Sequence, residues 1–307
     1  MFKNLVLYRI TAGWPQSLDQ IEANLQARRF APCLPTMDKS IGWIEPRGQA
    51  HGPLAESIGG HHILKLMVET KSVPGSLVRS KAQEAAEQIE QTTGRKPGKR
   101  EMGDLRADAL LGLLPVAFPR QSTCTLWIDP GARLLAIDSA SQSRADDATT
   151  LLIQCVDGLS LSLLNTQSSP QAAMTAWLSA ETPEEWPAEL SVERECVLKS
   201  HDEDKAVVRY TRHNLAEDQI REHIRQGKLP TELALSWDGR VSFVLTESLR
   251  LKKIAFLDTA FDEPSTQNDD GFDADVAIAT GEFTRLLPQL IGALGGEQTG
   301  ATEPQGA

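Results

Sequence analysis

The sequence predicts an α+β fold of mixed and antiparallel sheets with helices, two of which form a projecting antiparallel helical hairpin. Three observations indicate this class. Strand-like and helix-like segments follow one another without strict βα alternation. Asp238-Gly239 separates two apolar runs and is typical of a turn between antiparallel strands. The 307 residues, 40% of them apolar, are enough for about two domains with packed cores.

The first part of the chain predicts short strands and one helix. Residues 2–10 alternate and are rich in Leu, Val and Tyr, which favours a strand. Ser17 is a suitable N-cap, with Gln20 three residues later, for a helix that continues to Leu25. Further strands are expected at 41–44 and 62–68, separated by a stretch that contains Gly and Pro.

The hairpin is predicted from two helical segments joined by a loop that cannot be helical. Residues 77–91 are good helix formers with a thin apolar face, and Gly94, Pro97 and Gly98 interrupt the helix. We expect the pair to project, because the first helix has too little apolar surface to be buried. The second helix begins near Glu101 and places four apolar residues on one face: Met102, Leu105, Ala109 and Leu113.

The remaining elements follow from the same signals. The middle of the chain predicts strands at 123–128 and 133–137, a helix at 144–156, a strand at 159–164 and a helix at 172–178. After a linker at 182–188, the second half predicts strands at 195–199 and 206–210, a helix at 216–226, strands at 233–237, 241–245 and 251–256, a further segment at 274–280 and a last helix at 282–294.

These elements suggest four regions. Residues 1–73 and 117–181 form a first α+β region, and residues 74–116 form a helical finger with a basic tip. A second α+β region covers 182–294, and the Gly-, Thr- and Glu-rich tail 295–307 is expected to be disordered.

Charge is distributed unevenly along the chain. The net charge is −11, yet residues 1–150 carry 18 Lys and Arg against 16 Asp and Glu, whereas residues 151–307 carry 13 against 26. Residues 71–100 hold seven cations and only three carboxylates. This basic run is either a solvated helix face or a patch that binds polyanions, with the acidic half keeping nucleic acid off the rest of the surface.

No catalytic or metal-binding constellation is found in the sequence. The segment Gly94–Arg100 has its glycines too close together for a phosphate loop and lacks the hydroxyl that binds magnesium. Adjacent His61 and His62 would point to opposite faces of a strand. His213 and His223 have no Ser or Cys partner in a recognisable arrangement. We therefore expect a binding protein and not an enzyme, with no cofactor and no metal.

An acidic loop is the one candidate for a divalent-metal nuclease site. Its carboxylates do not have the EF-hand spacing, which favours a solvated loop. They are Asp262, Glu263, Asp269, Asp270, Asp273 and Asp275. Widely spaced Cys33, Cys124, Cys155 and Cys196 are expected to be free thiols. The chain also shows no export signal and no apolar run of membrane-spanning length, so we expect it in the cytoplasm and not in a membrane.

Eight segments carry a family resemblance in order across nearly the whole chain. They are Phe2–Arg9, Phe30–Cys33, Gly42–Pro46, Leu113–Phe118, Trp127–Asp129, Leu233–Trp237, Phe272–Asp275 and Thr280–Glu282. Together they resemble the RdgC family of bacterial recombination-associated proteins. The resemblance implies a nucleoid-associated, non-enzymatic protein that binds double- and single-stranded DNA with little sequence preference. It also implies a ring-shaped homodimer that encircles DNA and restrains RecA-mediated recombination.

The resemblance also implies roles for particular residues. Two fingers meet across the ring as a gate, which a phenylalanine seals, and Phe118 matches that residue. A basic residue near the finger tip that supports DNA binding matches Arg95, although Gly94, Pro97 and Gly98 stand where relatives often carry a longer lysine-rich helix end. The expected DNA-binding residues are Arg79, Lys81, Arg95, Lys96, Lys99 and Arg100.

Two rival functions remain open on the sequence. The alternative is a protein-interaction regulator that acts on the recombinase through the acidic second half, and a third interpretation is a nuclease that uses the acidic loop. For Phe118, the residues alone favour insertion into the monomer's own core, whereas the resemblance favours insertion into a partner.

Overall fold

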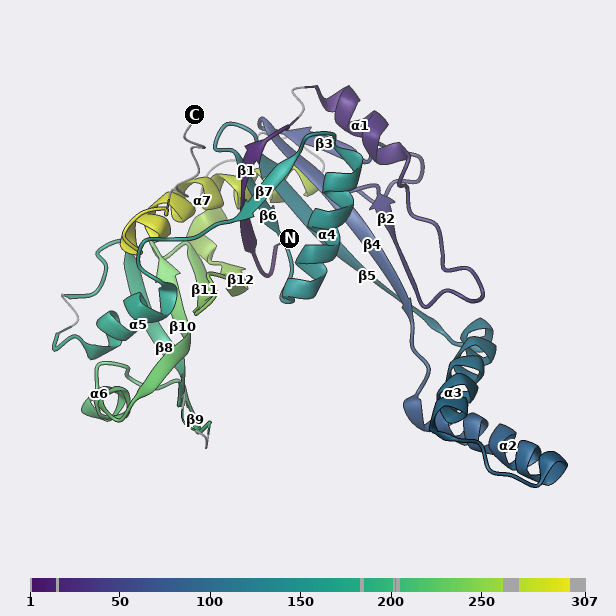
Figure 1. Ribbon diagram of the computed structural model, residues 1–307. Helices are drawn as coiled ribbons and strands as arrows, with labels where there is room; N and C mark the ends of the chain where they lie inside the picture. Colours follow the sequence, from purple (N-terminus) through teal and green to yellow (C-terminus); the bar gives the residue numbers. More distant parts are fainter. Residues whose placement is uncertain are drawn as a thin grey trace, which may run out of the picture. The chain divides into compact units, whose positions relative to one another are not determined.

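The computed structural model describes residues 2–14, 17–182, 185–200, 202, 205–261 and 271–298. These residues form seven α-helices and two antiparallel sheets, which confirms the predicted α+β class (Figure 1). The chain divides into two compact units. Unit 1 comprises residues 1–21, 55–63 and 125–307, and unit 2 comprises residues 22–54 and 64–124. This grouping joins residues that the sequence assigned to separate regions on either side of a linker at 182.

The first sheet of unit 1 is organised around the N-terminal strand β1 (Val6–Ala12). β1 pairs antiparallel with β6 (Leu134–Ile137) on one side and β7 (Ser160–Leu163) on the other, and β6 also pairs with the end of β5 (Pro119–Asp129). A further strand, β3 (Ala55–Ile58), lies in a stretch that the sequence predicted as loop.

The second sheet of unit 1 has the strand order β12-β11-β10-β8-β9. Its centre is the predicted meander, in which Asp238 and Gly239 both adopt positive φ in the turn between β10 and β11. The strands are β8 (Leu190–Ser200), β9 (Val207–Thr211), β10 (Lys228–Trp237), β11 (Val241–Thr246) and β12 (Leu251–Phe256).

The last helix differs from the prediction. The sequence separated a segment at 274–280 from a helix at 282–294, whereas the structure has one helix, α7 (Gly271–Ala293). The reason is a continuous apolar stripe at spacings of three and four, which only a helix can bury on one face. Its buried residues include Val276, Ala279, Phe283, Leu286, Leu287 and Leu290.

Phe283 of α7 is the centre of the unit 1 core. Its ring lies 5.7 Å from the ring of Phe2, 5.7 Å from that of Trp127 and 5.5 Å from that of Phe256, measured between centroids. One helix therefore joins the N-terminal segment and both sheets into one apolar cluster. The other helices of unit 1 are α4 (Gln142–Cys155), α5 (Pro170–Ser179) and α6 (Asp218–Arg225).

The beginning of the predicted disordered tail is part of the fold. The N–H of Gln167 donates to the carbonyl of Gly296 at 2.9 Å, and Arg9 Nε donates to Glu297 Oε1 at 2.9 Å. The correction applies to residues 295–298 only. The rest of the predicted tail, 299–307, lies outside the described residues.

Unit 2 pairs β2 (Lys39–Ile44) antiparallel with β4 (His61–Lys71), most of which lies in this unit. Helix α1 (Leu18–Gln26) begins in unit 1 and ends in unit 2. Gly42 is required in β2, because a Cβ there would lie 2.4 Å from Phe30 Cα. The backbone passes this closely because Phe30 N–H donates to Trp43 O, and Trp43 N–H donates to Arg28 O. The same unit holds α2 (Gly75–Thr93) and α3 (Lys99–Leu113).

All four cysteines are free thiols. Cys124 and Cys196 are buried, and burial raises the pKa of Cys196 to about 12, so this thiol is inert at neutral pH.

Candidate nucleic-acid interface

Helices α2 and α3, with the loop between them, form the α2–α3 segment, residues 75–113. The two helices pack on each other. Gly94 ends α2 in the left-handed conformation, with φ 73°, and its N–H donates to the carbonyl of Glu90 at 2.8 Å. Only Ala82 and Ala86 of α2 are buried, and α3 has no fully buried residue, so most of both helix surfaces is solvated. This agrees with the thin apolar face expected from the sequence.

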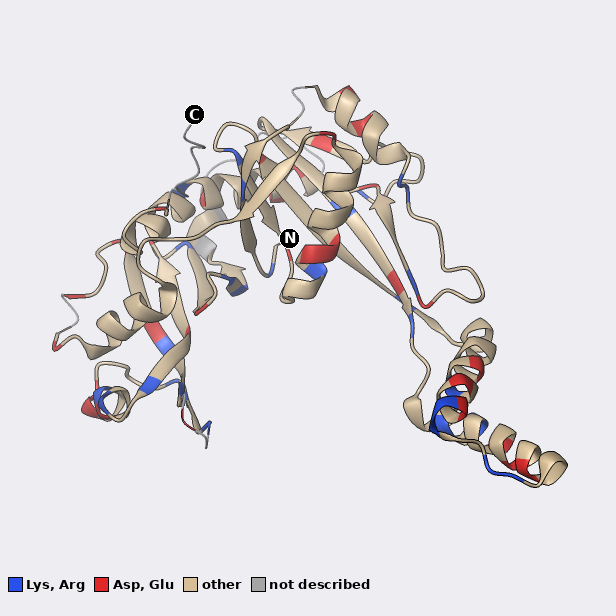
Figure 2. Ribbon diagram, viewed as in Figure 1, with Lys and Arg blue, Asp and Glu red and all other residues tan. Residues whose placement is uncertain are grey.

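All six cations expected to bind DNA are exposed on this segment. Arg79 and Lys81 are in α2, Arg95 and Lys96 are in the loop, and Lys99 and Arg100 begin α3. Figure 2 shows Lys and Arg along the loop and at the start of α3, with Asp and Glu further along both helices.

Three of the six cations are paired with carboxylates. Arg95 donates from Nη1 and Nη2 to Glu101 at 2.9 and 3.2 Å, and these hydrogen bonds lower the pKa of Glu101. Lys81 lies 2.8 Å from Glu84, and Lys96 lies 3.8 Å from Glu90. Exposed pairs of this kind contribute about 0–1 kcal/mol, so a phosphate can replace the carboxylate.

The other three cations, Arg79, Lys99 and Arg100, make no ion pair with any residue that the structure describes. Lys99 and Arg100 lie in the first turn of a 15-residue helix, where the helix dipole disfavours positive charge. Their position therefore does not stabilise the helix. It adds to the positive potential at the end of α3, which favours an anionic ligand.

Phe118 lies just beyond the α2–α3 segment, after the short 3₁₀ helix η1 (Leu114–Val116). It is 92% exposed, so it does not fill the core of its own chain, and the interpretation as a core residue is wrong. Neighbouring Val116 is 73% exposed.

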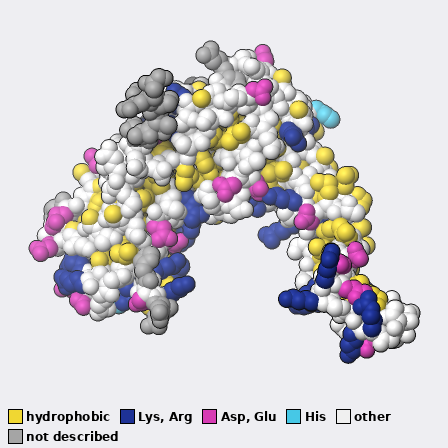
Figure 3. Space-filling view, in the orientation of Figure 1, with side chains coloured by type: hydrophobic (Ala, Val, Ile, Leu, Met, Phe, Trp, Pro, Cys, Tyr) yellow, Lys and Arg dark blue, Asp and Glu magenta, His cyan; other side chains and the backbone are white. Residues whose placement is uncertain are grey.

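The structure adds residues to this apolar surface that the sequence analysis missed. Figure 3 shows hydrophobic side chains at the surface near the end of α3. The sequence could have indicated these exposed residues, because Leu110 and Leu111 fall outside the apolar stripe of α3. The exposed large apolar residues of the α2–α3 segment and of the residues just after it are Leu77, Leu110, Leu111, Val116 and Phe118, which we call the Phe118 patch.

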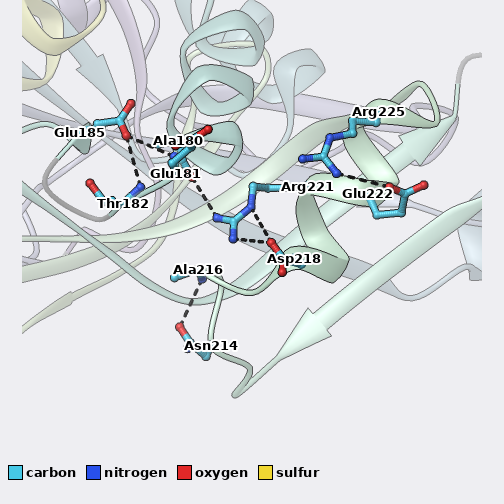
Figure 4. A network of polar contacts seen from close by, with 10 residues as sticks. All are labelled: Ala180, Glu181, Thr182, Glu185, Asn214, Ala216, Asp218, Arg221, Glu222 and Arg225. Carbon is cyan, nitrogen blue, oxygen red and sulfur yellow. Dashed lines mark hydrogen bonds and ion pairs between the residues drawn. The ribbon is translucent and has the colours of Figure 1, made fainter.

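Several charged side chains of unit 1 form hydrogen bonds and ion pairs within that unit. Arg221 of α6 donates to the carbonyl of Ala180 at 3.0 Å and to Asp218 Oδ1 at 2.7 Å, which lowers the pKa of Asp218 (Figure 4). Glu185 accepts hydrogen bonds from two backbone N–H groups at the end of α5. Arg221 joins α6 to the end of α5, and Glu185 holds the residues just after α5, so the role of both side chains is structural.

The described histidines of unit 1 lie against aromatic rings, and His213 and His223 share the ring of Tyr210. His61 packs edge-on against Trp127, and His62 lies against Trp14. His213 lies 4.9 Å from the ring of Tyr210, and His223 Nδ1 lies 3.2 Å from Lys228 Nζ. Within the described ranges, no group of three or more His, Cys, Asp or Glu could hold a metal ion.

Most of the acidic loop, residues 262–270, lies outside the described residues, while Asp273 and Asp275 are in α7. In the part of the chain that the structure covers, no helix has the length and apolarity to cross a membrane.

Comparisons with known proteins extend over nearly the whole chain. The family model "RdgC: Putative exonuclease, RdgC" matches residues 1–297. A recombination-associated protein RdgC of Dechloromonas aromatica is 40% identical over 302 residues, covering 96% of this chain and 98% of the relative. Proteins of the same name from Bordetella pertussis and Herminiimonas arsenicoxydans are 40% and 41% identical over 300 residues, with 97% of this chain and 99% and 98% of the relatives covered.

Proposed function

We propose, from the premise that this chain belongs to the RdgC family of recombination-associated proteins, that it binds DNA without sequence preference. The observation that carries the proposal is the set of six exposed cations in the α2–α3 segment. Flexible Lys and Arg side chains contact backbone phosphates, which are the same for every sequence. Duplex and single-stranded DNA both present these phosphates, so both are bound.

The proposed assembly is a homodimeric ring that encircles DNA. In this assembly the α2–α3 segment is a finger, and the Phe118 patch meets its counterpart on the second copy as a gate. An exposed phenylalanine among other exposed apolar side chains supports this, because monomeric surfaces rarely gather such residues and apolar patches mark contact sites. A closed ring around the chromosome restrains recombination by occupying the DNA that RecA needs.

The acidic balance of residues 151–307 supports the ring electrostatically. A surface that repels DNA everywhere except at its basic residues guides DNA to one site. The same acidic half also favours the alternative, a direct contact with the recombinase. These proposals differ in whether restraint of RecA requires DNA binding.

The test is binding to two unrelated duplexes and one single strand, with Arg95 and Lys96 both replaced by alanine in the variant. The proposal expects weaker binding to all three DNAs by a similar factor. Equal binding by variant and wild type would mean that these two cations belong to a solvated helix face and do not contact DNA. If the variant restrained RecA fully although it bound DNA poorly, the alternative would hold instead.

The family description also names an exonuclease, which would make the protein an enzyme. We propose a non-enzymatic role, since the six cations and the Phe118 patch fit holding DNA rather than cleaving it. Incubation of end-labelled linear DNA with the protein and magnesium decides between the two. Intact label supports the binding role, and progressive shortening from the ends contradicts it.

A further inference from the structure

Unit 1 contains a cavity of about 520 Å³ that the DNA-binding proposal does not use. Three turns of the first sheet supply its walls: the residues after β1, the turn between β3 and β4, and the turn between β5 and β6. Its volume lies in the range of small-molecule sites. The lining residues include Ile10, Trp14, Gly60, His62, Pro130 and Arg133.

Two aromatic rings in this wall have buried nitrogens without a partner. Trp14 and His62 lie with ring centroids 5.9 Å apart and planes tilted by 34°. His62 is only 9% exposed, and neither its Nδ1 nor Trp14 Nε1 has a hydrogen-bond partner among the described residues. Both nitrogens have less than 1 Å² of accessible surface, so a ligand in the cavity would meet the carbon atoms of these rings and not their nitrogens.

Arg133 supplies positive charge at the same cavity. Its guanidinium is held in place because Nε donates to the carbonyl of Ile10 at 3.0 Å and Nη2 donates to the carbonyl of Thr11. Nη1 has no partner among the described residues, so the group is both fixed and able to donate further. Burial lowers the pKa of His62, so this ring is neutral at pH 7 and Arg133 supplies the positive charge among the lining residues.

We propose that this cavity binds one deoxynucleotide, either free or as an unpaired residue of a DNA strand. The flat indole of Trp14 and the apolar side chains of Ile10 and Pro130 suit a planar base. Arg133 suits the phosphate, and stacking on the indole suits the base. A bare inorganic anion would contact only Arg133, and the apolar side chains of the wall would stay in contact with water. The inference deepens the proposed function, because it adds a base-stacking site that duplex DNA cannot fill.

The experiment follows the indole N–H signals of the full-length protein by nuclear magnetic resonance. The Trp14 signal is assigned by its loss in Trp14→Phe. Deoxythymidine monophosphate, a short oligothymidylate and inorganic phosphate are then added separately. The inference expects the nucleotide, the oligonucleotide or both to shift the Trp14 signal to saturation, and phosphate alone to leave it in place. A shift with only the monophosphate identifies a free nucleotide, and a shift with only the oligonucleotide identifies a strand.

A matched variant tests the role of the Trp14 indole. Trp14→Phe should weaken nucleotide binding about three- to tenfold, because the smaller ring offers less area for stacking on the base. Trp186→Phe makes the same chemical change where Nε1 already donates to Trp177 O at 2.8 Å, and it should bind as wild type does. No Trp14 shift with either nucleotide probe, or an equal shift with phosphate alone, overturns the inference.

Duplex binding measured on the same sample separates this inference from the proposed function. Duplex binding without a Trp14 shift contradicts the inference about the cavity and leaves the proposed function standing. A Trp14 shift without duplex binding supports the cavity and contradicts the proposed function.

Discussion

Helix α7 and the α2–α3 segment use the same ionic groups in opposite surroundings. In α7, Glu282 is 2% exposed and accepts hydrogen bonds from Arg240 and Arg285, each at 2.6 Å. In the α2–α3 segment, the pair of Arg95 and Glu101 is largely in water. A buried pair fixes structure because neither partner can find water, whereas an exposed pair can be exchanged for another ligand. The difference separates the cations that hold the fold from those that can exchange their partner for another anion.

The largest effect on stability is expected from removing the buried carboxylate of Glu282. Glu282→Ala removes the buried carboxylate that binds both Arg240 and Arg285, and we expect the free energy of unfolding to fall by about 3–5 kcal/mol. Denaturant unfolding measures this change. The matched control is Glu101→Ala, whose carboxylate is exposed to solvent, and its stability should change by less than about 1 kcal/mol. Equal changes for the two variants would remove the distinction between the pairs.

Phe283 of α7 and Phe118 after the α2–α3 segment extend the comparison of buried and exposed groups to apolar residues. Phe283→Ala should cost about 3–5 kcal/mol of stability because the ring is fully buried. Phe118→Ala should change stability by at most about 0.5 kcal/mol, since the ring is exposed. It should instead cost about 2 kcal/mol at the proposed contact between copies.

Retention on circular duplex DNA reports that contact, because a circle has no ends from which a ring can slide. We expect Phe118→Ala to be stable to heat yet to leave circles sooner than wild type. A large drop in melting temperature, with unchanged retention by the folded fraction, would contradict the gate.

The smallest effect is expected from freeing one paired cation. Glu101→Gln releases Arg95 and removes a negative charge, so DNA affinity should rise by about two- to fivefold, equivalent to less than ~1 kcal/mol. Gel shifts at low salt measure the change. A weaker complex would mean that Glu101 positions Arg95 for DNA rather than competing with it.

Acidification gives the same release without mutation. Because Arg95 lowers the pKa of Glu101, this carboxylate stays ionised until the pH falls below its ordinary value of about 4.3. The bond is therefore present above that pH and breaks only as the pH falls further. We expect the contribution of Glu101 to DNA affinity to be flat between pH 8 and about pH 5, measured as the difference between wild type and Glu101→Gln. A difference that changes near neutral pH would contradict this.

Local patterns were sufficient for much of the fold. The Asp238-Gly239 turn, the thin apolar face of α2 and the end of that helix at Gly94 all depend on near neighbours in the sequence. The continuity of α7 was not predicted, because the segment 274–280 is short and apolar and is consistent with either a strand or a buried helix. Residues 295–298 were missed because their order comes from contacts with residues 165–167, far away in the sequence.

The candidate site was only partly predictable for the same reason. Exposure of the six cations follows from helix composition, but the pairing of Arg95 with Glu101 requires the geometry of the intervening loop. Exposure of Phe118 contradicts what its residue type alone indicates, and the family resemblance was needed to expect it. The cavity at Trp14, His62 and Arg133 gathers residues from three turns, so only the sheet topology brings them together.

The most direct test of DNA binding by the unpaired cations is the slope of log affinity against log salt concentration for a random-sequence duplex. We expect a steep negative slope for the wild type and a slope flatter by about 1.8 for Lys99→Ala with Arg100→Ala, because each neutralised phosphate accounts for roughly 0.9 of the slope. The control, Arg225→Ala with Lys253→Ala, removes two exposed cations that pair with Glu222 and Glu195, and its slope should match the wild type. A slope that is unchanged in the first variant, or flattened equally in both, would contradict DNA binding through the α2–α3 segment.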